Sequence, residues 1–127
     1  MTWLWDTHAL IWATEDAAQL SGTARKAAQQ SGASAVCGIS LWEVACLVDK
    51  KRISLSIPLA DWMNEVAKRL PVLNITANIA ARCYELGKFH GDPADRIIVA
   101  TALVHGLKII TNDGKISKHP GVKTIWD

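Results

Sequence analysis

The chain has 127 residues, half of them hydrophobic, and a formal net charge of +2. This length fits one compact domain spanning residues 1–127, and the apolar content excludes a disordered chain. The net charge is too small either to require or to exclude a nucleic-acid partner.

The first part of the chain alternates between strand and helix patterns. In chain order, the predicted elements are a strand (Thr2–Trp5), two helices (His8–Thr14 and Gly22–Gln30), a second strand (Ala35–Gly38), a helix that Ser40 starts and Asp49–Arg52 closes, and a helix (Pro58–Leu70). Ser21 is a suitable N-cap for the second helix, and Pro58 is suited to open the fourth helix.

The same alternation continues to the end of the sequence. The predicted elements are a strand (Val72–Ile75), a helix capped by Thr76 and ending near Leu86, a helix (Ala94–His105), a strand (Lys108–Thr111), a turn (Asn112–Gly114) and a last strand (Val122–Ile125). Strands that alternate with helices predict an α/β fold with a parallel sheet flanked by helices.

The cysteines and the hydrophobic segments favour a cytoplasmic protein. Cys37, Cys46 and Cys83 form no CxxC pair and lie in largely apolar surroundings, so we expect reduced thiols. The first six residues lack a basic region and a long apolar stretch, so no signal peptide is expected. The run Ile97–Val104 is far shorter than the ~20 residues that span a bilayer, so no membrane association is expected.

Four acidic residues lie beside short apolar runs, where a strand or helix should meet a loop. They are Asp6, Glu43, Asp95 and Asp113. A parallel α/β sheet could bring them together, because ligands in such folds bind outside the carboxyl ends of the strands. Oxygen ligands without histidine or cysteine suit a hard divalent cation, so the four acids are candidate metal ligands.

Three of these acids also have a purely local explanation. Ser40 and Glu43 match the capping box S-x-x-E, in which Glu43 would bond back to the Ser40 amide. Asp6 could be the N-cap of the helix that follows it, and Asn112–Gly114 is an ordinary turn sequence that contains Asp113.

The segment before the helix Ala94–His105 has a local explanation too. Asp92 is a natural N-cap and Pro93 a natural first helical residue, while Asp95 would favour the positive end of the helix dipole. Capping alone would accept serine, threonine or asparagine about as readily as aspartate. Carboxylates at every position therefore favour a shared cation, since several carboxylates brought together repel one another strongly.

The histidines and tryptophans carry less information. The chain's histidines, His8, His90, His105 and His119, show no spacing typical of metal ligands, and we expect them to lie in loops or on the surface. Three tryptophans, Trp12, Trp42 and Trp62, are expected in the core. The other tryptophans and the apolar face of Pro58–Leu70 are candidate surfaces for a protein partner.

Four short motifs resemble those of PIN-domain proteins of the VapC type, the toxin half of a bacterial toxin–antitoxin pair. Asp6–Leu10 resembles the segment of the family's first acid, and Ser40–Ala45 resembles the helix of its second acid. His90–Ile98 resembles the third motif, as found in one subgroup, and Thr111–Asp113 resembles the fourth. The motifs occur in the family's order over essentially the whole chain.

The resemblance implies a PIN domain with a five-stranded parallel sheet in the order 3-2-1-4-5. It also implies an Mg²⁺- or Mn²⁺-dependent endoribonuclease, a cognate antitoxin that covers the active site, and a homodimer. The residues that carry over as catalytic, metal-binding acids are Asp6, Glu43, Asp95 and Asp113.

Further residues are expected around these acids. Asp92 and Arg96 would lie at the rim of the site. Thr7 follows Asp6 in the sequence and Thr111 lies two residues before Asp113, so these threonines could orient the carboxylates. The basic residues available to hold RNA are Lys50, Lys51, Arg52, Lys88, Arg96 and Lys115.

Three other interpretations stay open for the sequence alone. The first is a PIN nuclease that acts on DNA or structured nucleic acid. The second is a catalytically silent domain that only binds a partner. The third is a receiver-like α/β domain, which fits poorly because no lysine occupies the expected late strand end and Glu43 falls within a predicted helix.

Overall fold

The computed structural model describes residues 1–88 and 91–127, so Phe89 and His90, the latter being the first residue of the third motif, lie outside the described residues. The predicted fold is confirmed: five parallel strands form one sheet in the order β3-β2-β1-β4-β5. The strands are β1 (Trp3–Trp5), β2 (Ser34–Cys37), β3 (Val72–Leu73), β4 (Lys108–Ile110) and β5 (Thr124–Ile125).

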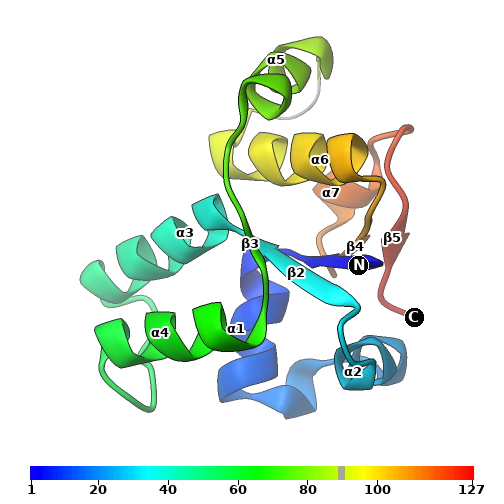
Figure 1. Cartoon of the computed structure of the whole chain (residues 1–127). Coiled ribbons are helices and arrows are strands. Elements are labelled where there is room, and N and C mark those ends of the chain that lie inside the picture. The colour runs from blue at the N-terminus through cyan, green and yellow to red at the C-terminus, as the bar shows by residue number, and fades with distance from the viewer. Residues whose placement is uncertain (89–90) are drawn as a thin grey trace.

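Helices cover both faces of this sheet (Figure 1). The helices are α1 (Thr7–Glu15), α2 (Gly22–Gln29), α3 (Gly38–Asp49), α4 (Leu59–Arg69), α5 (Ala77–Glu85), α6 (Pro93–His105) and α7 (Gly114–Ser117), with a 3₁₀ turn η1 (Ala17–Gln19). The sequence pattern did not predict η1 or α7, because elements of three or four residues are too short to show a helical period.

Side chains from the two faces of the sheet enter two separate cores. Trp5, Val36 and Ile110 pack with apolar residues of α1, α2, α3 and α4. Leu4 and Ile109, the residues next to Trp5 and Ile110, pack on the opposite face with residues of α6. Side chains of a strand alternate between faces, so apolar runs without alternation are what a sheet covered on both sides requires.

The ends of the helices follow the local signals in the sequence. Ser21 accepts a hydrogen bond from the Ala24 amide at the start of α2, and Thr76 accepts one from the Ile79 amide at the start of α5. Gly106 ends α6 with a φ of 67°, a left-handed conformation that glycine adopts without steric cost. The predicted caps Ser21 and Thr76 are confirmed.

The expectation that three tryptophans are core residues is wrong for one of them. Trp62 is 3% exposed and its indole N–H donates to Thr14, while Trp12 is partly buried and packs on Trp126. Trp42 is 62% exposed. The buried face of α3 runs through Ser40 and Val44, so a residue midway between them lies on another face of the helix.

Two further expectations concern thiols and membranes. Cys37 is buried, whereas Cys46 and Cys83 are partly buried, and each is a free thiol. Within residues 1–88 and 91–127, the helices are too short or too polar to cross a bilayer.

Candidate active site

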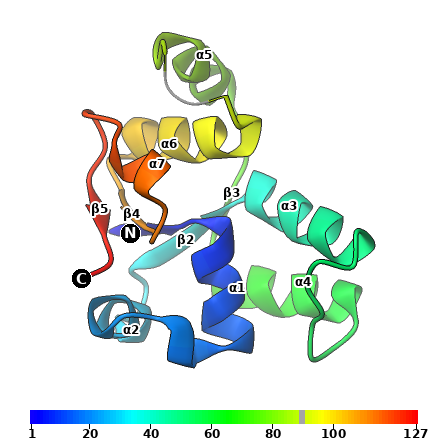
Figure 2. The same ribbon diagram turned by 180° about the vertical axis from the view of Figure 1, so that it is seen from behind.

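The predicted site lies at the edge of the sheet where the central strands end and helices begin. β1 leads directly into α1, and β2 leads directly into α3. Figure 2 shows the starts of α1, α3 and α6 near one another at this edge. Asp6 precedes α1, Glu43 lies within α3 and Asp95 lies in the first turn of α6, and the charges of Asp6 and Glu43 both act on Asp95.

Asp6 is both a helix cap and a member of this group of acids. Its Oδ1 accepts a hydrogen bond of 2.7 Å from the Ala9 amide, which makes it the N-cap of α1. Its Oδ2 accepts a hydrogen bond from the Thr111 hydroxyl, which lies at the end of β4. The local explanation is thus confirmed for Asp6, but it uses only one of the two carboxylate oxygens.

Thr111 joins Asp6 to a second acid. Its hydroxyl oxygen accepts a hydrogen bond of 2.9 Å from the Asp113 amide while the same hydroxyl donates to Asp6. Asp113 in turn caps α7, since its Oδ1 accepts a hydrogen bond of 2.8 Å from the Lys115 amide. A short helix therefore follows Asp113, where the sequence pattern predicted only a turn.

Glu43 is held by a different threonine. Its Oε1 accepts a hydrogen bond from the Thr7 hydroxyl at the start of α1. The capping-box interpretation is wrong, because α3 begins at Gly38 with Cys37 as its N-cap and Ser40 already lies inside the helix. Because α3 starts two residues earlier than predicted, Glu43 lies in the second turn of the helix, where it faces α1.

The start of α6 brings Asp92 and Asp95 to the same edge. The Oδ1 of Asp92 accepts hydrogen bonds from the amides of Ala94 (2.9 Å) and Asp95 (3.3 Å), and Pro93 follows as the first helical residue. The predicted N-cap is confirmed. The side chain of Asp95 lies within the first turn of the helix and is partly buried.

The electrostatics of the site show that these acids interact. The pKa of Asp95 rises from 3.8 to about 7, first because the carboxyl is buried and then because of the charges of Asp92, Asp113, Glu43 and Asp6. Burial also raises the pKa of Asp6 and of Glu43, although hydrogen bonds from Thr111 and Thr7 work against it. Asp95 therefore lies in the combined field of the other four acids.

His8 is a neighbour of the site that the sequence analysis did not identify. It is exposed on the first turn of α1. Burial raises the pKa of Asp6 and of Glu43, and the electrostatic interaction of each acid with His8 works against that rise. A search for the histidine spacing of metal ligands could not find it, because His8 acts on Asp6 and Glu43 through its electrostatic field and not as one of several spaced ligands. Its position two residues after Asp6 was the available signal.

The basic residues that were expected to hold RNA are distributed unevenly. Lys50–Arg52 follow the far end of α3, roughly 10 Å along the helix axis from Glu43. Lys115 is exposed and its amide bonds Asp113, which places it beside the acids. The Arg96 guanidinium donates to the carbonyls of Cys83 (2.7 Å) and Gly87 (3.2 Å). Lys88 is exposed on the segment before residue 89.

The chemistry of the acids fits a hard divalent cation. They offer only carboxylate oxygens, and their charges repel one another, as the raised pKa of Asp95 records. In residues 1–88 and 91–127, however, no three His, Cys, Asp or Glu side chains already form a group that could hold a metal ion. The carboxylate oxygens therefore suit Mg²⁺ or Mn²⁺ as ligands, although the described side chains are not close enough together to coordinate the ion as they stand.

A cavity of about 560 Å³ lies elsewhere in the molecule and contains none of the candidate acids. It is bordered by α1, the turn before β2 and α4, and Trp5, Trp62, Val66, Glu15 and Arg69 are among its lining residues. The cavity is therefore separate from the acidic edge of the sheet.

Comparisons with known proteins agree with this architecture. Residues 4–122 match the model of the PIN domain family. The chain is 37% identical to Ribonuclease VapC22 of Mycobacterium tuberculosis, over 98% of both chains. The structure is similar to a toxin–antitoxin complex from Klebsiella pneumoniae, with a TM-score of 0.68 and 26% identity over 95% of both chains.

A more distant structure shows the same fold. DNA-bound VapBC from Salmonella typhimurium gives a TM-score of 0.76 at 20% identity, over 98% of this chain and 97% of that one. At this level of identity the likeness concerns the arrangement of helices and strands, and not the chemistry of the site.

Proposed function

The chain belongs to the PIN-domain family, and we propose that it is a divalent-cation-dependent endoribonuclease, the toxin member of a toxin–antitoxin pair. One observation carries the proposal. Asp6, Asp95 and Asp113 at the starts of α1, α6 and α7, together with Glu43 in α3, lie at one edge of the sheet, where Thr111 donates a hydrogen bond to Asp6 and Thr7 donates one to Glu43.

Mg²⁺ or Mn²⁺ would be held by Asp6, Glu43, Asp95 and Asp113. When bound, such a cation lowers the pKa of a water molecule and offsets negative charge on the scissile phosphate and its leaving oxygen. Support for the proposal comes from the oxygen-only ligand set and from the mutual repulsion of the acids, which a cation would relieve.

The residues of the chain itself would position these acids. The Thr111 hydroxyl fixes one oxygen of Asp6 while the Ala9 amide fixes the other, so the carboxylate cannot rotate freely. Thr7 limits Glu43 in the same way. Hydrogen bonds of this kind orient ligands and are worth about 10- to 100-fold in metal affinity or activity. Lys115, whose amide donates to Asp113, is the cationic residue beside the acids that would attract a phosphate backbone.

The partners of the protein form part of the proposal. The substrate would be RNA, as the name of the mycobacterial relative states for that protein. A cognate antitoxin would cover the site, since the related structure from Klebsiella pneumoniae is a toxin–antitoxin complex. We also propose that residues 1–127 form one domain, that the protein acts in the cytoplasm, and that it assembles as a homodimer.

Cleavage of matched RNA and DNA oligonucleotides, each with Mg²⁺ and with EDTA, tests the proposal. We expect RNA to be cut only with Mg²⁺. Attack by water forms a new P–O bond, breaks the bond to the 3′ oxygen and leaves a 5′-phosphate and a 3′-hydroxyl. Products that end in a 2′,3′-cyclic phosphate would contradict this chemistry, and preferential cleavage of DNA would favour the alternative nuclease.

Expression in a bacterial host separates an enzyme from a silent binding domain. Growth arrest that Asp6→Asn abolishes would support catalysis, because this change keeps the size of the side chain but removes its charge. Growth arrest that survives Asp6→Asn would show that a binding function causes it. Glu65→Gln on α4, a partly buried acid that pairs with Lys68 and Arg69, is a suitable control.

A further inference from the structure

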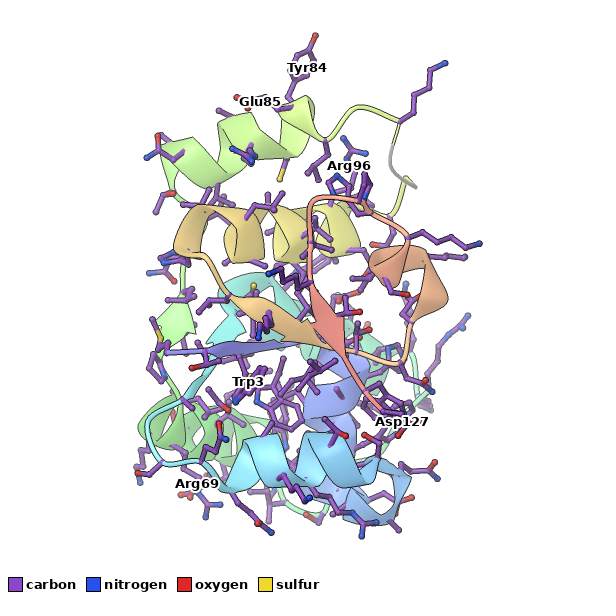
Figure 3. All side chains as sticks on the ribbon, turned by 90° about the vertical axis from the view of Figure 1, so that its right-hand side faces the viewer. Trp3, Arg69, Tyr84, Glu85, Arg96 and Asp127 are labelled. Atoms are coloured by element: carbon purple, nitrogen blue, oxygen red, sulfur yellow. The ribbon has the colours of Figure 1, made fainter. Side chains whose placement is uncertain are left out.

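Arg96 makes contacts that differ from those of a residue that holds RNA. Its Nη2 donates to the Cys83 carbonyl at 2.7 Å, and its Nη1 donates to the Gly87 carbonyl at 3.2 Å. In return, the Cys83 thiol donates to the Arg96 carbonyl at 3.7 Å. Figure 3 shows Arg96 between α5 and α6, the two helices that these contacts join.

The Arg96 guanidinium provides hydrogen-bond donors for backbone carbonyls at and just after the end of α5. The last four carbonyls of a helix have no partner within the helix, and a cation there also interacts favourably with the helix dipole. Cys83 lies in the last turn of α5, and Gly87 follows the helix with a φ of 66°. A guanidinium presents several N–H groups in a rigid fork, so one side chain can bond two carbonyls at once.

The backbone of Arg96 belongs to the turn that carries the site acids. Its amide donates to the Asp92 carbonyl at 3.1 Å, and Asp95 precedes it in the sequence. Asp92 in turn holds the amides of Ala94 and Asp95 through its carboxylate. One residue thus links the end of α5 to the first turn of α6, where two acids of the site are placed.

We infer that Arg96 is a positioning residue, which fixes Asp92 and Asp95 by clamping the first turn of α6 to the end of α5. The inference rests on the proposed function for its catalytic consequence, but not for the clamp itself. It also assigns Arg96 a role different from direct contact with the RNA backbone. Burial lowers the pKa of His119, and the charges of Arg82 and Arg96 lower it further, so the Arg96 guanidinium also acts on a third segment of the chain.

The test compares Arg96→Gln and Arg96→Lys with Arg82→Gln, which removes an equal charge from an exposed position on α5. Amide exchange of Ala94 and Asp95, measured by NMR in EDTA, reports on the clamp without any activity. We expect Arg96→Gln to speed this exchange at least tenfold, with a smaller effect for Arg96→Lys, which retains the charge but not the fork. Arg82→Gln should leave the exchange unchanged.

Kinetics and cation binding then separate positioning from RNA contact. For Arg96→Gln we expect Mn²⁺ affinity and kcat to fall about tenfold, in the range seen for groups that orient metal ligands, while KM changes less than twofold. A raised KM with unchanged kcat, Mn²⁺ affinity and amide exchange would overturn the inference and assign Arg96 to RNA binding. If Arg96→Gln does not fold, Arg96→Lys provides the same comparison.

The result does not depend on whether the proposed function is correct. If the wild-type protein cuts no RNA, the proposed function fails, but amide exchange in the variants still decides whether the clamp exists. If the wild type cuts RNA and Arg96→Gln leaves exchange and cation affinity unchanged, only the inference about Arg96 fails.

Discussion

At the scale of single residues, capping a helix and serving the site are compatible roles. Asp6 uses Oδ1 to cap α1 and Oδ2 to accept from Thr111, and Asp92 needs only Oδ1 to cap α6. A carboxylate has two oxygens and about four positions that can accept hydrogen bonds. The local interpretation of these acids therefore says little about whether they also bind a cation.

Thr111 provides the sharpest single-residue test of how the acids are held. Thr111→Val keeps the shape but removes the hydroxyl, so Asp6 loses a donor and the Asp113 amide loses an acceptor. We expect Mn²⁺ affinity and RNA cleavage to fall about 10- to 100-fold, as is usual for such orienting groups. Titration calorimetry and a cleavage assay measure the two effects. Thr111→Ser retains the hydroxyl, and an equal loss in both variants would argue against this role.

The raised pKa of Asp95 predicts how the stability of the protein depends on pH when no divalent cation is present. Its pKa is about 7 in the folded protein but 3.8 ordinarily, so between these values the folded state holds a proton that the unfolded state has lost. Stability should therefore fall as pH rises from about 4 to about 7. The raised pKa values of Asp6 and Glu43 act in the same direction.

Thermal unfolding in EDTA across this pH range measures the effect. Asp95→Asn removes the ionisable carboxyl group. The Tm of this variant should therefore fall less as pH rises, and should exceed the Tm of the wild type at pH 8. Asp61→Asn, at an exposed position on α4, is the matched control. A wild-type Tm that climbs steadily from pH 4 to pH 7 would contradict the electrostatics of the site.

At the scale of elements, the sequence predicted what periodicity and capping residues encode. The five strands and six longer helices were expected within a few residues of their observed bounds, because each has an apolar pattern or a cap. The start of α3 was misplaced by two residues, because Cys37 caps it without a side-chain hydrogen bond and leaves no recognisable signal. That displacement is why the capping-box interpretation of Glu43 failed.

Asp92 allows the cap of α6 to be separated from the charge of the site. Serine caps a helix about as well as aspartate, so Asp92→Ser should keep nearly wild-type stability, while Asp92→Ala should lose about 1 kcal/mol. Urea unfolding measures this difference. Among the charged neighbours of Asp95, Asp92 raises its pKa the most. Asp92→Ser should therefore lower the pKa of Asp95, and NMR titration in EDTA measures this change. If the pKa of Asp95 stays at the wild-type value, Asp92 does not act on Asp95 and is not part of the site.

At the scale of the whole molecule, the strand order decides which distant residues meet. A parallel sheet places all strand ends of one kind at one edge, which made it predictable that the four acids lie toward the same edge. The positions of cationic side chains were not predictable in the same way. Lys50–Arg52 lie beyond the far end of α3, His8 lies beside two acids, and Arg96 faces α5. These relations depend on helix directions and on side-chain contacts, which the sequence pattern does not contain.

The central claim is that acids from separate segments form one cation site, and calorimetric titration of Mn²⁺ tests it most directly. The proteins to compare are the wild type, the control Glu65→Gln and the single variants Asp6→Asn, Glu43→Gln, Asp95→Asn and Asp113→Asn. We predict that the wild type and the control bind Mn²⁺ alike, and that each of the four site variants binds it at least about tenfold more weakly. Site variants that bind Mn²⁺ as tightly as the wild type would contradict the claim.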